Sequence, residues 1–139
     1  MGIISCLIIS RLAFHYIKDL APVFKGIDTS LKKGGIVVFS VEHPIITSCY
    51  EAYHQKVKRG NWIVDNYFKS GERINNWIGK DVVKYHRTIA EYFQLFQKTG
   101  FNLVQLEESK PDKANFTNLV EYERRSRIPL FLFFKLEKK

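Results

Sequence analysis

The chain contains three short hydrophobic segments in which residues at both even and odd positions are apolar. These segments are residues 3–9, 36–41 and 130–134, and β-branched or aromatic residues dominate them. A strand that is apolar on both faces is typical of a parallel sheet with both faces covered. We therefore predict three strands that are each buried on both faces.

A segment with the apolar spacing of an amphipathic helix lies between the first two predicted strands. Apolar residues follow one another at helical spacing: Leu20, Val23, Phe24, Ile27 and Leu31. Asp19 can cap such a helix and Pro22 falls in its first turn, where proline is tolerated. Lys32 and Lys33 suit a helix C-terminus, and Gly34 can supply a left-handed cap. We expect the helix to end there.

A second helix is predicted after residue 87. Thr88 and Glu91 have the spacing of a capping box, in which two helix-terminal N–H groups are satisfied reciprocally. An apolar face follows, and Gly100 ends the helix. Residues 101–107 then read as another strand, so the chain predicts an α/β fold with at least two crossover units.

Residues 45–87 interrupt this alternation, and we interpret them as an inserted cap within a single domain of residues 1–139. The segment is rich in large rings that require burial: Tyr50, Tyr53, Trp62, Tyr67, Phe68 and Trp77. Residues 69–72 are predicted to form a turn between two short extended pieces. Residues 82–87 alternate and are expected to be extended.

Right-handed crossovers would place both helices on the same face of the sheet. The other face would then be bare, although the strands are apolar on both sides. The first strand also reads as a central strand with a neighbour expected on each side. No two glycines are spaced as G-x-G, so no phosphate-cradling loop is predicted. The pattern therefore indicates the second half of a doubly wound sheet.

The composition excludes several classes of protein but does not indicate a function. Two cysteines, Cys6 and Cys49, form no disulfide framework, and the four histidines lack metal-ligand spacing, so no metal is expected. The first apolar run is too short for a membrane span and lacks the basic region of a signal peptide, which favours a cytoplasmic protein. The formal charge of +8 permits an anionic partner, but the basic residues are scattered and solvated faces explain them more simply.

Three segments resemble parts of class I S-adenosylmethionine-dependent methyltransferases of the type 11 or 12 branch. "IISRLAFHYIKDLAPVFKGIDTSLKKGGIVVFSVEHP" is similar to the fourth strand, the following helix and the fifth strand. "YHRTIAEYFQLFQKTGFNLVQLEES" resembles a later helix and the sixth strand, and "PLFLFFKLEKK" the antiparallel seventh strand. The resemblance implies a partial Rossmann-like sheet, with strands equivalent to the fourth to seventh, helices mainly on one face and an aromatic-rich cap.

The resemblance also implies a cofactor, S-adenosylmethionine, and a small-molecule substrate. The glycine-rich loop and the ribose-binding acidic residue of the family belong to the half that this chain does not match, so cofactor binding by this chain alone is expected to be weak. Cofactor contacts are implied for the stretch after the fourth strand: Ser10, Arg11, Leu12, Ala13 and His15. Substrate contacts are implied for Tyr67, Trp77, His86 and Arg87. His43 or Glu42 would serve as a base if the acceptor must lose a proton.

Each of these residues also has a structural interpretation. His15 is equally well explained as a satisfied structural histidine, and Tyr67 and Trp77 as cap packing. His86 and Arg87 either bind an anionic group or face solvent. His43 is favoured as a site residue because strand carboxyl ends host sites in open α/β sheets.

Three functional hypotheses remain open from the sequence. The first is a methyltransferase present as a truncated C-terminal portion, which is inactive by itself. The second is a catalytically inactive, dimerising or regulatory module, whose bare sheet face would pair with a second copy in a homodimer or with a partner. Under the first hypothesis, a missing N-terminal half would cover that face instead. The third is a basic nucleic-acid-binding module, which rests on charge alone and lacks a recognised motif.

Overall fold

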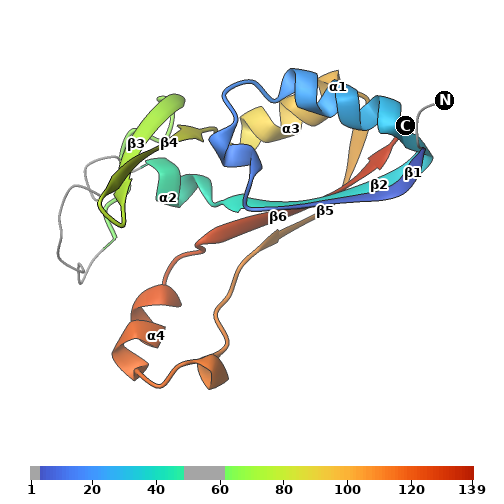
Figure 1. The fold of residues 1–139 in the computed structure, drawn as a ribbon. Helices are drawn as coiled ribbons and strands as arrows, with labels where there is room; N and C mark the ends of the chain where they lie inside the picture. The colour runs from blue at the N-terminus through green and yellow to red at the C-terminus, as the bar shows by residue number, and fades with distance from the viewer. Residues whose placement is uncertain (1–3, 49–61) are drawn as a thin grey trace.

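A computed structural model describes residues 4–48 and 62–139 of the chain, and its centre is a four-stranded sheet (Figure 1). The strands are β1 (Ser5–Arg11), β2 (Leu31–Glu42), β5 (Phe101–Glu108) and β6 (Phe131–Lys138). Their order across the sheet is β1-β2-β6-β5. β1 and β2 are parallel, whereas β6 is antiparallel to both of its neighbours. The α/β class and the antiparallel last strand are confirmed.

Two helices, α1 (Ala21–Ser30) and α3 (Ile89–Lys98), cover the same face of this sheet (Figure 1). Phe24 from α1 and Phe96 from α3 meet Phe39 and Phe134 from the middle strands, with ring centroids 4.9–5.9 Å apart. All four rings are at most 1% exposed. These contacts form the core, and the predicted arrangement of the helices on one face is confirmed.

The opposite face of the sheet has no covering helix within the described residues 4–48 and 62–139. Leu7 and Ile9 of β1 are 49% and 69% exposed, and Phe133 of β6 is 41% exposed. The prediction that the first and last strands are buried on both faces is therefore wrong for this structure. The reason is that, among the described residues, the helices that cover the sheet are α1 and α3, and both lie on one side of it.

Helix α1 begins one residue later than a cap at Asp19 would place it, since Leu20 is its N-cap residue, and it ends earlier than predicted. The Asp19 carboxylate accepts a hydrogen bond from the N–H of Ala21 at 3.0 Å. The helix ends at Ser30, because Leu31 adopts an extended conformation and buries its side chain in the core. The cation near the helix end is Lys138, whose Nζ lies 2.5 Å from the carbonyl of Asp28. Lys32 and Lys33 lie in β2 instead, where they are exposed.

Helix α3 begins with the predicted capping box. The Thr88 side chain accepts from the N–H of Glu91, and the Glu91 carboxylate accepts from the N–H of Thr88 at 2.7 Å. Gly100 follows the helix with φ +89°, a backbone conformation that residues with a Cβ rarely adopt. The local sequence therefore fixes both ends of this helix.

A short helix, α2 (Pro44–Ser48), and a hairpin formed by β3 (Gly71–Trp77) and β4 (Lys80–His86) lie within the predicted cap segment 45–87 or at its edge. The hairpin pairs Trp77 with Lys80, so its turn is at Ile78 and Gly79. The prediction of a turn between two extended pieces at residues 69–72 is therefore wrong, since β3 begins at Gly71. The extended conformation predicted for residues 82–87 is confirmed up to His86. Tyr50, Tyr53 and Cys49 lie outside the described residues.

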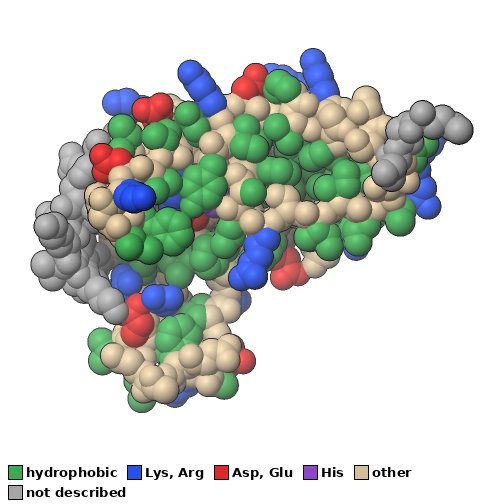
Figure 2. Space-filling view, in the orientation of Figure 1, with side chains coloured by type: hydrophobic (Ala, Val, Ile, Leu, Met, Phe, Trp, Pro, Cys, Tyr) green, Lys and Arg blue, Asp and Glu red, His purple; other side chains and the backbone are tan. Residues whose placement is uncertain are grey.

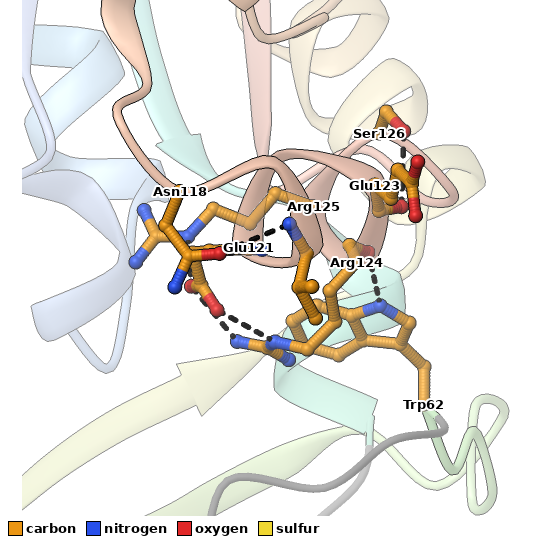
Figure 3. Close-up of polar contacts among 8 residues, drawn as sticks. Trp62, Asn118, Glu121, Glu123, Arg124, Arg125 and Ser126 are labelled. Atoms are coloured by element: carbon orange, nitrogen blue, oxygen red, sulfur yellow. Dashed lines mark hydrogen bonds and ion pairs between the residues drawn. The ribbon is translucent and has the colours of Figure 1, made fainter.

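An arm between β5 and β6 carries a 3-10 turn, Lys113–Asn115, and helix α4 (Leu119–Arg125), which the sequence analysis missed. In Figure 1 the arm projects on the side of the sheet opposite α1 and α3. Trp62 joins the cap to this arm (Figure 3): its Nε1–H donates to the carbonyl of Arg124 at 2.9 Å, and the Arg124 guanidinium lies 4.3 Å from its ring centroid. Glu121 forms ion pairs with Arg124 and Arg125. The arginine cluster at residues 124–127 is thus partly neutralised within its own helix.

No helix in the described ranges is long and apolar enough to cross a membrane. Within those same ranges, no group of histidine, cysteine and acidic side chains is arranged to hold a metal ion.

Candidate functional site

A pocket of about 370 Å³ lies beside the carboxyl ends of β1 and β2, and the β3–β4 hairpin forms its other wall. This is the position at which open α/β sheets bind ligands. The lining residues come from the turn after β1, the end of β2, the hairpin and the start of β6: Leu12, His15, Tyr16, Glu42, Asn75, Asn76, Trp77, Lys84 and Phe131.

Leu12 starts the turn that brings His15 into the pocket. Its φ of +50° is uncommon for a residue with a Cβ and bends the chain away from β1. The Leu12 N–H donates to the carbonyl of Ser40 at 2.9 Å and lies 3.3 Å from the Ser40 hydroxyl. A short 3-10 turn, Phe14–Tyr16, follows. The strained residue is thus held in place by β2.

His15 is 2% exposed, and one edge of its ring is bonded to the backbone. Its Nδ1 accepts a hydrogen bond from the N–H of Glu42 at 3.2 Å. A nitrogen that accepts from an N–H carries no proton, so the neutral ring carries its proton on Nε2. Burial lowers the pKa of His15 below its ordinary value, opposed by the charge of Glu42 and aided by Lys84 and Arg87. The histidine is therefore a neutral group with a fixed tautomer.

Glu42 and Lys84 form an ion pair at the base of the pocket. The Lys84 ammonium lies 2.7 Å from Glu42 Oε1, and both side chains are largely buried. The same ammonium lies 5.7 Å from the centroid of the Tyr16 ring. The second carboxylate oxygen, Oε2, is buried without a hydrogen-bond partner. The pair therefore neutralises the charge of Glu42 and ties the hairpin to the end of β2.

His43 does not line this pocket, and both of its ring nitrogens are occupied. Nδ1 accepts from the N–H of Ile45 at 3.1 Å, so Nε2 carries the proton and donates it to the Glu108 carboxylate at 2.9 Å. The ring is 1% exposed, and burial lowers its pKa. In this arrangement His43 holds the start of α2 against β5. Its role as a base remains a prediction that this geometry does not test.

His86, Tyr67 and Arg87 connect the hairpin to its surroundings. The His86 Nε2–H donates to the carbonyl of Tyr67 at 2.7 Å, and its Nδ1 lies 2.7 Å from the Thr47 hydroxyl. Arg87 donates to the carbonyls of residues 17 and 18 at 2.6 and 2.7 Å. The Tyr67 hydroxyl accepts from the N–H of Ile89 at 3.3 Å. Of the predicted substrate contacts, only Trp77 lines the pocket.

Some of the predicted cofactor contacts line the pocket and others do not. Leu12 and His15 line the pocket. Ser10 lies half-buried in β1, Arg11 is exposed at the end of that strand, and Ala13 is exposed before the 3-10 turn. Ser10, Arg11 and Ala13 remain predicted contacts for a cofactor and are not brought into this pocket.

The sequence analysis missed several lining residues: Tyr16, Asn75, Asn76, Lys84 and Phe131. The placement of a turn at residues 69–72 concealed the alternation along β3, in which Arg73 and Asn75 are buried and their neighbours are exposed. The glycine at position 79, followed by the alternating residues 82–86, was the signal that could have revealed the hairpin.

No family model matches the chain. An uncharacterised protein of Haemophilus influenzae is 31% identical over 137 residues, which cover 94% of this chain and 53% of that protein. The chain thus spans about half the length of this curated relative.

Two solved structures are similar over nearly the whole chain. One is a proposed S-adenosylmethionine-dependent methyltransferase from Listeria monocytogenes, with a TM-score of 0.84 and 32% identity, covering 96% of this chain and 61% of that one. The other is an S-adenosylmethionine-dependent methyltransferase from Mesorhizobium loti, with a TM-score of 0.81 and 32% identity, covering 99% and 65%. The sheet order and these similarities show that the chain has a class I methyltransferase-like fold.

Proposed function

We propose that this chain supplies the acceptor side of a site for S-adenosylmethionine-dependent methyl transfer to a small molecule. The observation that carries the proposal is the pocket at the carboxyl ends of β1 and β2, in a fold similar to S-adenosylmethionine-dependent methyltransferases. Four residues predicted from the sequence line it: Leu12, His15, Glu42 and Trp77. The methyl donor would be S-adenosylmethionine, held in part by the turn after β1.

Methyl transfer requires little acid–base catalysis from the protein. Methyl transfer from a sulfonium needs in-line alignment of the two reactants and exclusion of water. The rings of Tyr16, Trp77 and Phe131, together with Leu12, give the pocket apolar walls for that purpose. A base is needed only when the acceptor must lose a proton. Glu42 and His43 remain the proposed groups for that step.

Titration with S-adenosylhomocysteine, followed by calorimetry, tests this proposal. We expect weak but saturable binding, because the sequence has no glycine pair spaced to cradle a cofactor. Trp77→Ala, which removes a pocket wall, should weaken binding of an acceptor or of S-adenosylhomocysteine at least severalfold. Phe68→Ala is the matched control, since Phe68 is 91% exposed and does not line the pocket. Equal effects of the two substitutions would contradict the proposal.

A second candidate function is a module that associates through the uncovered sheet face. The observation that favours it is the exposed apolar surface of that face, where Leu7, Ile9 and Phe133 are at least 41% exposed. Figure 2 shows hydrophobic side chains reaching the surface below the helices. Surfaces of this kind are typical of interfaces between proteins.

Analytical ultracentrifugation tests this second candidate function by measuring self-association of the chain. We expect the wild-type chain to associate as its concentration rises, and Ile9→Lys to shift the equilibrium towards monomer. Phe68→Lys is the control, since Phe68 is 91% exposed and lies outside the four-stranded sheet. A wild-type chain that stays monomeric at all concentrations would exclude self-association through this face.

A further inference from the structure

Two of the residues that line the pocket carry a buried hydrogen-bond acceptor without a partner. Asn75 is 4% exposed, and the buried atom is its amide oxygen, Oδ1. The Glu42 side chain is 18% exposed, and the buried atom is its carboxylate oxygen Oε2. Neither oxygen has a donor among residues 4–48 and 62–139. Within these ranges, the buried atoms of the pocket lining that lack a partner are therefore both acceptors.

The two acceptors come from different walls of the pocket. Glu42 is the last residue of β2, and Asn75 lies in β3 of the hairpin that forms the other wall. A buried acceptor without a partner is unfavourable, because it has lost its hydrogen bonds to water, and buried polar atoms in folded proteins are nearly always hydrogen-bonded. A ligand that donates hydrogen bonds would supply the partners that the described residues do not.

The charges of the pocket favour a donor that is neutral. The Lys84 ammonium lies 2.7 Å from Glu42 Oε1, so the carboxylate charge is already compensated. A ligand ammonium would be attracted by Glu42 but repelled by Lys84. A ligand carboxylate has no hydrogen to donate and would leave both acceptors unpartnered. A hydroxyl, an amide or an aromatic amine donates without adding a charge.

We propose that Glu42 Oε2 and Asn75 Oδ1 accept hydrogen bonds from neutral O–H or N–H groups of the methyl acceptor. The terminal torsions of glutamate and asparagine side chains are broad, and rotation about them presents each oxygen to the pocket. The pocket then selects small molecules whose apolar body packs against Leu12, Trp77 and Phe131 and carries a hydroxyl or neutral N–H group. This inference rests on the proposed function and names the chemical class of its acceptor.

Test compounds that share one aromatic ring separate the alternatives: benzyl alcohol, benzyl methyl ether, benzoate and benzylammonium. The ether is the matched control, because it keeps the oxygen of the alcohol and lacks the hydrogen. Binding to the full ¹⁵N-labelled chain is measured by chemical-shift titration, followed at the backbone N–H of Glu42 and the side-chain amide of Asn75. We expect benzyl alcohol to bind about tenfold more tightly than the ether. Binding of any other compound as tightly as the alcohol, or no binding of any compound, would overturn the proposal.

Glu42→Gln tests the carboxylate oxygen by putting a donor in its place. The Lys84 ammonium donates to Oε1 and would hold the oxygen of the glutamine amide at that position, so that the amide NH₂ replaces Oε2. We expect benzyl alcohol to bind this variant about tenfold more weakly than wild type, whereas benzyl methyl ether, which can only accept, binds it at least as well. A loss of equal size for both compounds would contradict the acceptor role of Glu42.

Asn75→Leu removes the second acceptor without a large change in side-chain size, and it decides the question if the Glu42 variant does not fold. We expect it to weaken binding of benzyl alcohol severalfold and to leave binding of the ether unchanged. Asn102→Leu is the matched control, since Asn102 is exposed on β5 and does not line the pocket. An equal loss for alcohol and ether would mean that Asn75 only shapes the wall and would overturn its assignment.

The proposed function and this inference fail separately. Selective binding of benzyl alcohol without binding of S-adenosylhomocysteine would leave the recognition of a neutral donor standing and remove the methyltransferase proposal. Binding of S-adenosylhomocysteine combined with equal binding of the alcohol and the ether would do the reverse.

Discussion

Replacement of Phe39 by alanine is expected to lower the free energy of unfolding by about 3–5 kcal/mol, the usual cost of removing a buried phenylalanine side chain. Phe39 is 1% exposed in the middle of β2. Its ring lies 5.0 Å from that of Phe14 and 4.9 Å from that of Phe134, between centroids. The cavity left by alanine would open between both helices and the sheet. Urea unfolding followed by circular dichroism measures the change.

Phe133→Ala is the matched control for this prediction. Phe133 lies on β6, paired with Ser40, and is 41% exposed on the face that no helix covers. We expect a cost well below that of Phe39→Ala, because much of the side chain is already in water. If the two substitutions cost the same, the uncovered face would be buried in solution, which would contradict the one-sided core. Phe39→Leu, with a smaller loss, keeps the comparison informative if the alanine variant does not fold.

The stability of the chain is expected to fall as the pH is lowered from 7 to 5.5. Burial lowers the pKa of three histidines, His15, His43 and His86, below their ordinary value. A lowered pKa means that the unfolded chain binds protons first as the pH falls below about 6.5, the ordinary histidine value. Their stabilising contribution is therefore complete above that pH and is lost below it. Each histidine contributes a slope of at most about 1.4 kcal/mol per pH unit.

Urea unfolding at several pH values checks this prediction, with His86→Gln as the comparison. Removing one buried histidine should make the pH dependence shallower, even though the variant is less stable at pH 7 because the contacts to Tyr67 and Thr47 are disturbed. Stability that is constant or rises between pH 7 and 5.5 would show that these histidines are exposed or charged in the folded chain.

Local signals predicted most of the fold correctly. The capping box of Thr88 and Glu91 begins α3, and the hydrophobic segments form β1, β2 and β6. Each of these depends on residues close together in sequence. The end of α1 was misplaced because Leu31 becomes extended and buries its side chain in the core, and because the cation at the helix end is Lys138, 110 residues from Asp28. Local helix signals contain no information about such a contact.

Three of the four predicted site residues that line the pocket follow the strand ends, and the fourth, Trp77, was implied by the resemblance alone. Leu12 and His15, which the resemblance implied, and Glu42 come directly after or at the end of parallel strands, and the structure places all three at one edge. Asn75 and Lys84 belong to a hairpin whose position against that edge is set by tertiary contacts, among them the Glu42–Lys84 ion pair. His43 was placed at the correct edge, but its bond to Glu108 of β5 could not be read from its neighbours in the sequence.

The most direct measurement of the central claim is a residue-resolved titration of the ¹⁵N-labelled chain with S-adenosylhomocysteine. The claim is that the carboxyl edge of β1 and β2 forms part of a methyl-transfer site. It predicts saturable shifts, at millimolar ligand if necessary, at Leu12, His15 and Glu42, with the arm that carries α4 unaffected. The absence of shifts at this edge, or shifts confined to another surface, would contradict the claim and leave a methyltransferase-like fold without its site.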